Sequence, residues 1–227
     1  MNPNPCALMT KSAWLFDLDG TLIDSSNGVV RAFHFAQGKF GEPPADEWAI
    51  RKTIGYPLQQ AVRDLTNIPF DQFILEFRKE AMATMHTDAK LLPGVLELLA
   101  AIRDQGRVMA LVTAKRGDNA RRILDHLNAL DFFGAIVGDD NAARGKPDAA
   151  PVYAALDLLK AKAADAVFIG DTRIDIQCGR ASGVPVIALG SGYETEEDLA
   201  GADLFVPDAS ALHVRFSECV QLAGSGN

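Results

Sequence analysis

The pattern of apolar and polar residues changes twice along the chain. Residues 13–16, Ala-Trp-Leu-Phe, form a short continuous apolar run that predicts a buried strand. Residues 25–92 then contain no convincing strand, and their apolar positions recur at helical spacing. Prolines and glycines divide this stretch into candidate helices at residues 27–40, 45–54, 57–66 and 69–88.

From residue 93 onward, short β-rich runs alternate with amphipathic segments. The predicted strands are residues 108–112, 135–137, 166–169, 184–189 and 204–206, and the predicted helices are 95–105, 118–127, 149–160, 174–181, 196–200 and 209–222. Parallel strands need long crossover connections, which helices usually supply. This alternation therefore predicts a doubly wound α/β fold with a parallel, Rossmann-like sheet.

The first apolar run belongs to the same sheet by its buried character. The sequence thus predicts an α/β core of residues 12–24 and 93–222, with an all-helical insert of residues 25–92. Ligands of open parallel sheets bind beyond the carboxyl ends of the strands, so an insert leaving there would cover the site as a cap. Residues 1–11 and 223–227 are expected to be loose ends.

Composition restricts the partners that the chain can bind. Its 227 residues are 48% apolar, which is enough for a sizeable core. A net charge of −8 without a stripe of lysine or arginine argues against a nucleic acid or an anionic membrane as partner. No apolar run reaches the about 18 residues of a membrane span, and no leader pattern is visible. We expect a cytoplasmic protein, either a monomer or a homodimer.

The three cysteines are Cys6, Cys178 and Cys219. They are widely spaced, with no Cys-x-x-Cys pair and no histidine cluster beside them. This spacing predicts neither a disulfide framework nor a zinc site.

Two carboxylates follow the first apolar run. Asp17 and Asp19 are one residue apart and precede Gly20, so both leave the same face of the strand where the backbone can turn. Like charges this close need a cation or a shared proton between them, which indicates a divalent metal or acid–base chemistry. A calcium loop does not fit, because Thr21 and Gly28 occupy positions where it needs oxygen ligands.

Further chemical groups stand where other predicted strands end or helices begin: Thr113, Lys146, Asp171 and Asp175. Each alone also fits an ordinary turn or solvated loop. A doubly wound sheet, however, brings these positions into one crevice. Together they provide oxygen ligands for Mg²⁺, a carboxylate nucleophile and a cation for a phosphoryl group. The chain lacks a P-loop and a Gly-x-Gly-x-x-Gly motif, which argues against an NTPase or a dinucleotide site.

In their order and spacing, these motifs resemble the haloacid dehalogenase-like hydrolase superfamily over essentially the whole chain. Residues 17–25, Asp-Leu-Asp-Gly-Thr-Leu-Ile-Asp-Ser, resemble its first motif; the second is Thr113, the third Lys146 with Pro147, and the fourth Asp171 with Asp175. The resemblance implies that Asp17 is the nucleophile and Asp19 the general acid–base. It implies Mg²⁺ held by Asp17, Asp171 and the Asp19 backbone carbonyl, with Asp175 as a further ligand or its neighbour, and a helical insert of the C1 cap type.

The resemblance also implies a phosphatase of a small phosphorylated metabolite, since members that cleave carbon–halogen bonds lack the second aspartate. Residues 51–58 and 112–115 look most like the phosphoglycolate phosphatase group, which implies 2-phosphoglycolate as substrate. Candidate substrate contacts are Arg51, Lys52, Tyr56 and Lys115. Ala114 and Ala149 depart from that group, which often has asparagine and proline there.

Three alternatives remain open at this point. A β-phosphoglucomutase-like phosphotransferase shares every core residue named above and differs only in its cap contacts. A pyrophosphatase of the same superfamily is a second alternative. A phospho-accepting receiver or binding module is an alternative of another class, although receivers lack a helical insert and carry their metal acids on an earlier strand.

Overall fold

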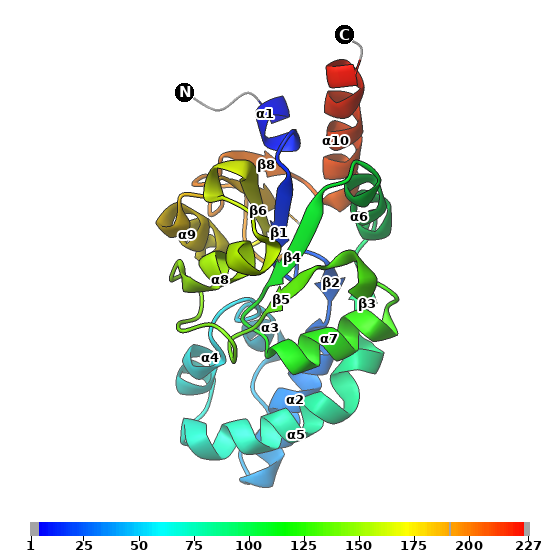
Figure 1. The fold of residues 1–227 in the computed structure, drawn as a ribbon. Coiled ribbons are helices and arrows are strands. Elements are labelled where there is room, and N and C mark those ends of the chain that lie inside the picture. Colours follow the sequence, from blue (N-terminus) through cyan, green and yellow to red (C-terminus); the bar gives the residue numbers. More distant parts are fainter. Residues whose placement is uncertain (1–4, 191, 225–227) are drawn as a thin grey trace.

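The computed structural model describes residues 5–190 and 192–224, and its centre is a six-stranded parallel sheet (Figure 1). The strand order is β5-β4-β1-β6-β7-β8. These strands are β1 (Ala13–Phe16), β4 (Val108–Val112), β5 (Ala135–Val137), β6 (Ala166–Gly170), β7 (Val186–Leu189) and β8 (Leu204–Val206). The central strand β1 pairs with β4 on one side and β6 on the other. The predicted doubly wound α/β sheet is confirmed.

Successive residues of β1 pack against opposite layers, as the twofold repeat of a strand requires. Trp14 and Phe16 belong to the core on one face, which is covered by α1 (Pro5–Met9), α6 (Val95–Asp104), α7 (Gly117–His126) and α10 (Ala209–Gly224). Ala13 and Leu15 belong to the core on the other face, covered by α8 (Ala150–Leu159) and α9 (Arg173–Ser182). The sheet is therefore buried on both sides, and its strands are apolar throughout.

A helical block with its own apolar core lies beyond one end of the sheet, away from both termini (Figure 1). It consists of α2 (Ser26–Lys39), α3 (Glu47–Arg51), α4 (Leu58–Leu65) and α5 (Phe70–Asp88). Phe33 and Phe73 pack at its centre, with ring centroids 4.7 Å apart. The chain enters it through β2 (Ile23–Asp24) and leaves it through β3 (Lys90–Leu91), which pair antiparallel. The prediction of no strand within residues 25–92 is wrong for this two-residue β3.

The prediction of a loose N-terminal segment is wrong for Pro5–Met9, which form α1. Leu8 and Met9 are buried, and α1 packs on α10. The Sγ atoms of Cys6 and Cys219 are 2.06 Å apart and form a disulfide. The prediction of no disulfide is therefore also wrong. The two cysteines are separated by 213 residues, so their proximity depends on the packing of the two end helices and leaves no mark in local spacing.

Two smaller predictions also need correction. Residues 196–200 form turns in place of the predicted helix, because a five-residue segment that buries only Leu199 gains little from helical packing. At the C-terminus, α10 extends to Gly224, two residues beyond its predicted end; residues 1–4 and 225–227 lie outside the described part. In the described residues, no helix combines the length and apolar character needed to cross a membrane.

Candidate active site

The carboxyl ends of three adjacent strands bring the predicted site residues together. Asp17 directly follows β1, Thr113 follows β4 and Asp171 follows β6. The backbone N–H of Asp17 donates to the Ile169 carbonyl at 2.9 Å, so the sheet pairing extends to the acidic residue itself. All three side chains are buried. The predicted convergence of these strand ends is what the structure shows.

Lys146 lies at the centre of this group and is buried. Its Nζ is 2.7 Å from Asp17 Oδ1 and 2.7 Å from Asp175 Oδ1. Burial alone would lower the pKa of Lys146, but the charges of Asp17 and Asp175 outweigh it and raise the pKa above its usual value. The lysine is therefore a fixed cation and not a solvated loop residue.

Asp17, Asp171 and Asp175 form a buried acidic cluster. One carboxylate oxygen from each lies within 4.8 Å of the others. Burial raises the pKa of Asp17 to about 7, against the lowering effect of Lys146. Burial, with the charge of Asp17, also raises the pKa of Asp171 well above its usual range. Asp17 Oδ2 is buried and has no hydrogen-bond partner among the described residues. Three carboxylates with an unpartnered oxygen fit a divalent cation, which prefers oxygen ligands and would stabilise their ionised forms.

The members of the cluster are not equally free to bind an ion. Asp175 Oδ1 receives Lys146, while its Oδ2 accepts the backbone N–H of Thr172 at 3.0 Å and the Thr172 hydroxyl at 2.7 Å. Asp171 Oδ1 accepts the Thr21 hydroxyl at 2.7 Å. A Cβ at Gly20 would come within 2.1 Å of Asp171 Oδ2. Glycine at position 20 thus leaves room for the Asp171 carboxylate, whose Oδ2 stays available for an ion. Both oxygens of Asp175, by contrast, are already hydrogen-bonded.

Asp19 occupies the next position on the same side of the crevice. The hydroxyl of Ser25 donates to its Oδ1, and Lys115 Nζ is 3.2 Å from its Oδ2. Lys115 Nζ also lies 3.1 Å from Met85 Sδ in the helical block. Neither Ser25 nor Thr21 was predicted as a site residue, although both stand within the first motif.

A cavity of about 390 Å³ lies between these residues and the helical block. Its core side includes Asp17, Asp19, Thr113, Lys115, Arg116 and Lys146, and its block side includes Tyr56, Phe77, Arg78, Met82 and Met85. Arg78 and Arg116 were missed by sequence analysis. Their role could not be read from the sequence, because the direction in which α5 and α7 face depends on how the helices pack.

Two of the predicted substrate contacts lie away from this cavity. Arg51 hydrogen-bonds to Ser26 and to Asn27 Oδ1 within the helical block, the latter at 2.7 Å. Lys52 Nζ lies 5.4 Å from the ring centroid of Trp48. Tyr56 and Lys115 do line the cavity. The structure therefore brings together only half of the predicted substrate contacts.

A family model described as haloacid dehalogenase-like hydrolase matches residues 14–189. The chain belongs to this family. The match includes every motif residue from Asp17 to Asp175, so the family resemblance inferred from those motifs is confirmed.

Similarity to haloacid dehalogenase-like phosphatases extends over most of the chain. "Probable phosphatase IndB" of Dickeya dadantii is 31% identical over 198 residues, covering 83% of this chain and 85% of the relative. A phosphoglycolate phosphatase of Pseudomonas putida is 32% identical over 210 residues, covering 87% and 77%. A haloacid dehalogenase-like hydrolase structure from Bacteroides fragilis matches at 28% identity with a TM-score of 0.84, covering 89% and 99%. The prediction of a phosphatase in this family is thereby confirmed.

Proposed function

We propose that the protein hydrolyses phosphate monoesters through an aspartyl-phosphate on Asp17, with Mg²⁺ as the divalent ion. The observation that carries this proposal is the state of the Asp17 carboxylate. Lys146 holds its Oδ1 at 2.7 Å, while its buried Oδ2 has no partner among the described residues. Asp17 also lines the cavity that would receive an ester. A carboxylate held in this way is ready for nucleophilic attack, with a cation beside it for the phosphoryl charge.

The reaction then proceeds in two halves. An oxygen of Asp17 attacks phosphorus, the bond from phosphorus to the ester oxygen breaks, and Asp19 gives that oxygen a proton. Asp19 next takes a proton from water, whose oxygen attacks phosphorus and breaks the bond to Asp17. Inorganic phosphate leaves, and both carboxyl groups return to their starting forms.

Neighbouring side chains orient this chemistry. Ser25 and Lys115 contact the two oxygens of Asp19 and fix its carboxyl group beside Asp17. The Thr113 Oγ1 accepts the backbone N–H of Lys115 at 3.1 Å, which leaves its own proton free to donate to a phosphoryl oxygen.

We assign the Mg²⁺ ligands to Asp17, Asp171 and the Asp19 backbone carbonyl. Both oxygens of Asp175 are engaged by Lys146 and Thr172, so we place Asp175 beside the ion as the group that orients Lys146. When bound, the ion neutralises part of the carboxylate charge and so admits an anionic ester.

We propose 2-phosphoglycolate as the substrate and the helical block as a cap over it. Relatives named phosphoglycolate phosphatase are 32% identical to this chain. The cavity gives independent support, because Lys115 stands beside Asp19, where the ester oxygen departs. Arg78 lines the same cavity, where Asp118 and Asp139 attract its charge but no carboxylate of the described residues lies at ion-pair distance from it. These two cations are suited to the carboxylate that 2-phosphoglycolate carries one carbon from its ester oxygen.

The test is a phosphatase assay over 2-phosphoglycolate, hexose phosphates, nucleotides and pyrophosphate, with and without chelator. We expect chelation to abolish turnover, Mg²⁺ to restore it, and 2-phosphoglycolate to give the highest kcat/KM. Preference for a hexose phosphate or for pyrophosphate would instead support one of the two superfamily alternatives. Full turnover in excess chelator would contradict the role of the metal.

Asp17→Asn tests the nucleophile. The amide is nearly isosteric but a poor nucleophile, so we expect turnover to fall below about one thousandth of the wild-type value while the fold is kept. The matched control is Asp104→Asn, an exposed carboxylate at the end of α6. Wild-type turnover in Asp17→Asn would rule out the aspartyl-phosphate, and mass spectrometry of acid-quenched enzyme would detect that intermediate directly.

A further inference from the structure

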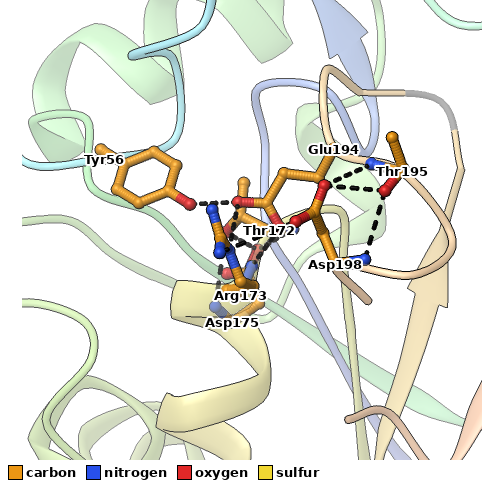
Figure 2. A network of polar contacts seen from close by, with 7 residues as sticks. All are labelled: Tyr56, Thr172, Arg173, Asp175, Glu194, Thr195 and Asp198. Atoms are coloured by element: carbon orange, nitrogen blue, oxygen red, sulfur yellow. Dashed lines mark hydrogen bonds and ion pairs between the residues drawn. The ribbon is translucent and has the colours of Figure 1, made fainter. Parts of the chain in front are cut away.

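The helical block contacts the core at a second place, beside the cavity that Asp17 and Lys146 line. There the turn of residues 53–56 lies against the first turn of α9 and the segment 192–198 (Figure 2). Gly55 has φ +91°, and a Cβ on it would come within 2.8 Å of Thr172 Cγ2. The ring of Trp48 meets that of Tyr193 edge-on, with centroids 5.5 Å apart. The block thus rests directly on the loop that follows Asp171.

One carboxylate joins the two sides of this contact. Glu194 Oε1 accepts the hydroxyl of Tyr56 from the helical block (Figure 2). Its Oε2 accepts the backbone N–H of Arg173, the first residue of α9, at 2.9 Å. Arg173 Nε lies 3.4 Å from Oε1. The Glu194 side chain is only 9% exposed, so water competes poorly for these partners.

The contact continues from Arg173 into the candidate active site. Thr172 caps α9 through reciprocal hydrogen bonds with Asp175. Asp175 in turn holds Lys146, which holds Asp17. A continuous series of contacts therefore links the helical block, through Glu194 and the start of α9, to Asp17.

We propose that Glu194 is a positioning residue that latches the helical block closed over the site through Tyr56 and fixes the start of α9 through Arg173. This inference rests on the proposed function for its catalytic consequences but not for the latch itself. Burial, reinforced by Glu194, raises the pKa of Tyr56 to about 12, so its hydroxyl keeps the proton that it donates at neutral pH. The latch increases the population of the closed form. If substrate binds this form, its apparent affinity is higher when the latch is intact.

Tyr56→Phe removes the link to the block and keeps the ring that lines the cavity. We expect KM to rise about tenfold or more, as for loss of a hydrogen bond to a charged group, with kcat nearly unchanged. Glu194→Ala should raise KM equally and also lower kcat, because α9 loses a partner at its first N–H. In the double variant KM should rise no further than in Glu194→Ala. Additive effects would refute the latch.

Two comparisons separate a latch from a substrate contact. The Tyr56 hydroxyl bonds to Glu194 and not to a cavity residue, so KM should rise by the same factor for 2-phosphoglycolate and for p-nitrophenyl phosphate. Unequal factors would mean that Tyr56 reads the substrate and would overturn the proposal. The matched control is Glu196→Ala, an exposed acidic residue of the same segment, which should match the wild type.

Trp48 gives a readout that needs no turnover. The chain has two tryptophans, and iodide reaches Trp48, which is 54% exposed, but not the fully buried Trp14. Iodide quenching without substrate should increase in Tyr56→Phe and Glu194→Ala, but not in Glu196→Ala, as Trp48 separates from Tyr193. Unchanged quenching in both variants would refute the latch. Increased quenching in an enzyme without phosphatase activity would keep the latch and refute the proposed function.

Discussion

Lys146 and Asp175 show how single residues of this site depend on one another. A lysine with almost no exposed surface is stable only when its charge is paired, and here two carboxylates contact it at 2.7 Å. Thr172 binds the second oxygen of Asp175. Lys146 contacts only Oδ1 of Asp17, and Oδ2 of Asp17 has no partner in the described residues. Removing the lysine would leave two buried carboxylates without their cation, which typically costs about 3–5 kcal/mol of stability.

Arg78 is the residue for which the structure makes a new prediction about specificity. It is exposed and lines the cavity, and its charge is attracted by Asp118 and Asp139 without a carboxylate at ion-pair distance in the described residues. A charged hydrogen bond to the substrate carboxylate should be lost in Arg78→Ala, so we expect kcat/KM for 2-phosphoglycolate to fall about tenfold or more. The measurement compares this loss with that for p-nitrophenyl phosphate, whose leaving group has no carboxylate and which should change little.

Lys79→Ala is the matched control for Arg78, since Lys79 is the next residue of α5, equally charged and exposed, but does not line the cavity. Equal losses for both substrates in Arg78→Ala would place the effect on the phosphoryl group or the fold. No loss of kcat/KM for either substrate would show that Arg78 does not contact the substrate. Lys115 alone would then have to bind the carboxylate of 2-phosphoglycolate.

At the scale of secondary structure, the start of α9 connects stability with the site. Thr172 caps this helix, accepting the Asp175 N–H and donating to the Asp175 carboxylate. Thr172→Ala removes both bonds, so we expect the free energy of unfolding to fall by about 1–2 kcal/mol, as for loss of an N-cap. Thr172→Ser keeps the hydroxyl and should recover most of it in urea denaturation. If the two variants were equally unstable, the methyl group that faces Gly55 would be the important part of Thr172.

The elements that were predicted correctly are those with strong local signals. The apolar run of β1 and the alternation after residue 93 reflect a sheet buried on both faces, a constraint that acts on every strand residue. Residues 196–200, predicted as a helix, bury little and form turns. The strand β3 was missed because two residues that pair only with β2 have no periodicity to detect.

The site residues likewise divide into those with a local sequence signal and those whose position depends on tertiary packing. Asp17, Thr113 and Asp171 could be placed in one crevice because parallel strands end at the same edge of the sheet, and Lys146 because it precedes a helix that begins at that edge. The residues of the helical block could not be placed in this way. Arg51 and Arg78 look alike in sequence. Only the packing of the helices decides that Arg51, at the end of α3, reaches Asn27 of α2 while Arg78 of α5 lines the cavity.

At the scale of the whole molecule, the Cys6–Cys219 disulfide joins the two ends of the chain. It links α1 to α10 on the face of the sheet that holds Trp14, with the aromatic ring of Phe216 packed edge-on to that tryptophan. Such a bond persists in an oxidising compartment and is rare in the cytosol, so the cytoplasmic location expected from the sequence stays a prediction. The third cysteine does not compete for the bond. Cys178 is buried, and burial raises the pKa of its thiol to about 12, which keeps it protonated and unreactive.

Because the disulfide closes nearly the whole chain into a loop, it restricts the unfolded state far more than the folded one. Loops of this length correspond to about 2–5 kcal/mol of stabilisation. We therefore expect Cys6→Ser, or reduction of the wild type, to lower Tm by roughly 5–15 °C in a calorimetric scan. Cys6 lies in α1, before the amino end of β1, whereas Asp17 follows the carboxyl end of that strand, so kcat/KM at 25 °C should not change (Figure 1). Cys178→Ser is the control, and reductant should lower its Tm as much as that of the wild type. If reductant did not change the Tm of the wild type, packing alone would hold the two end helices together.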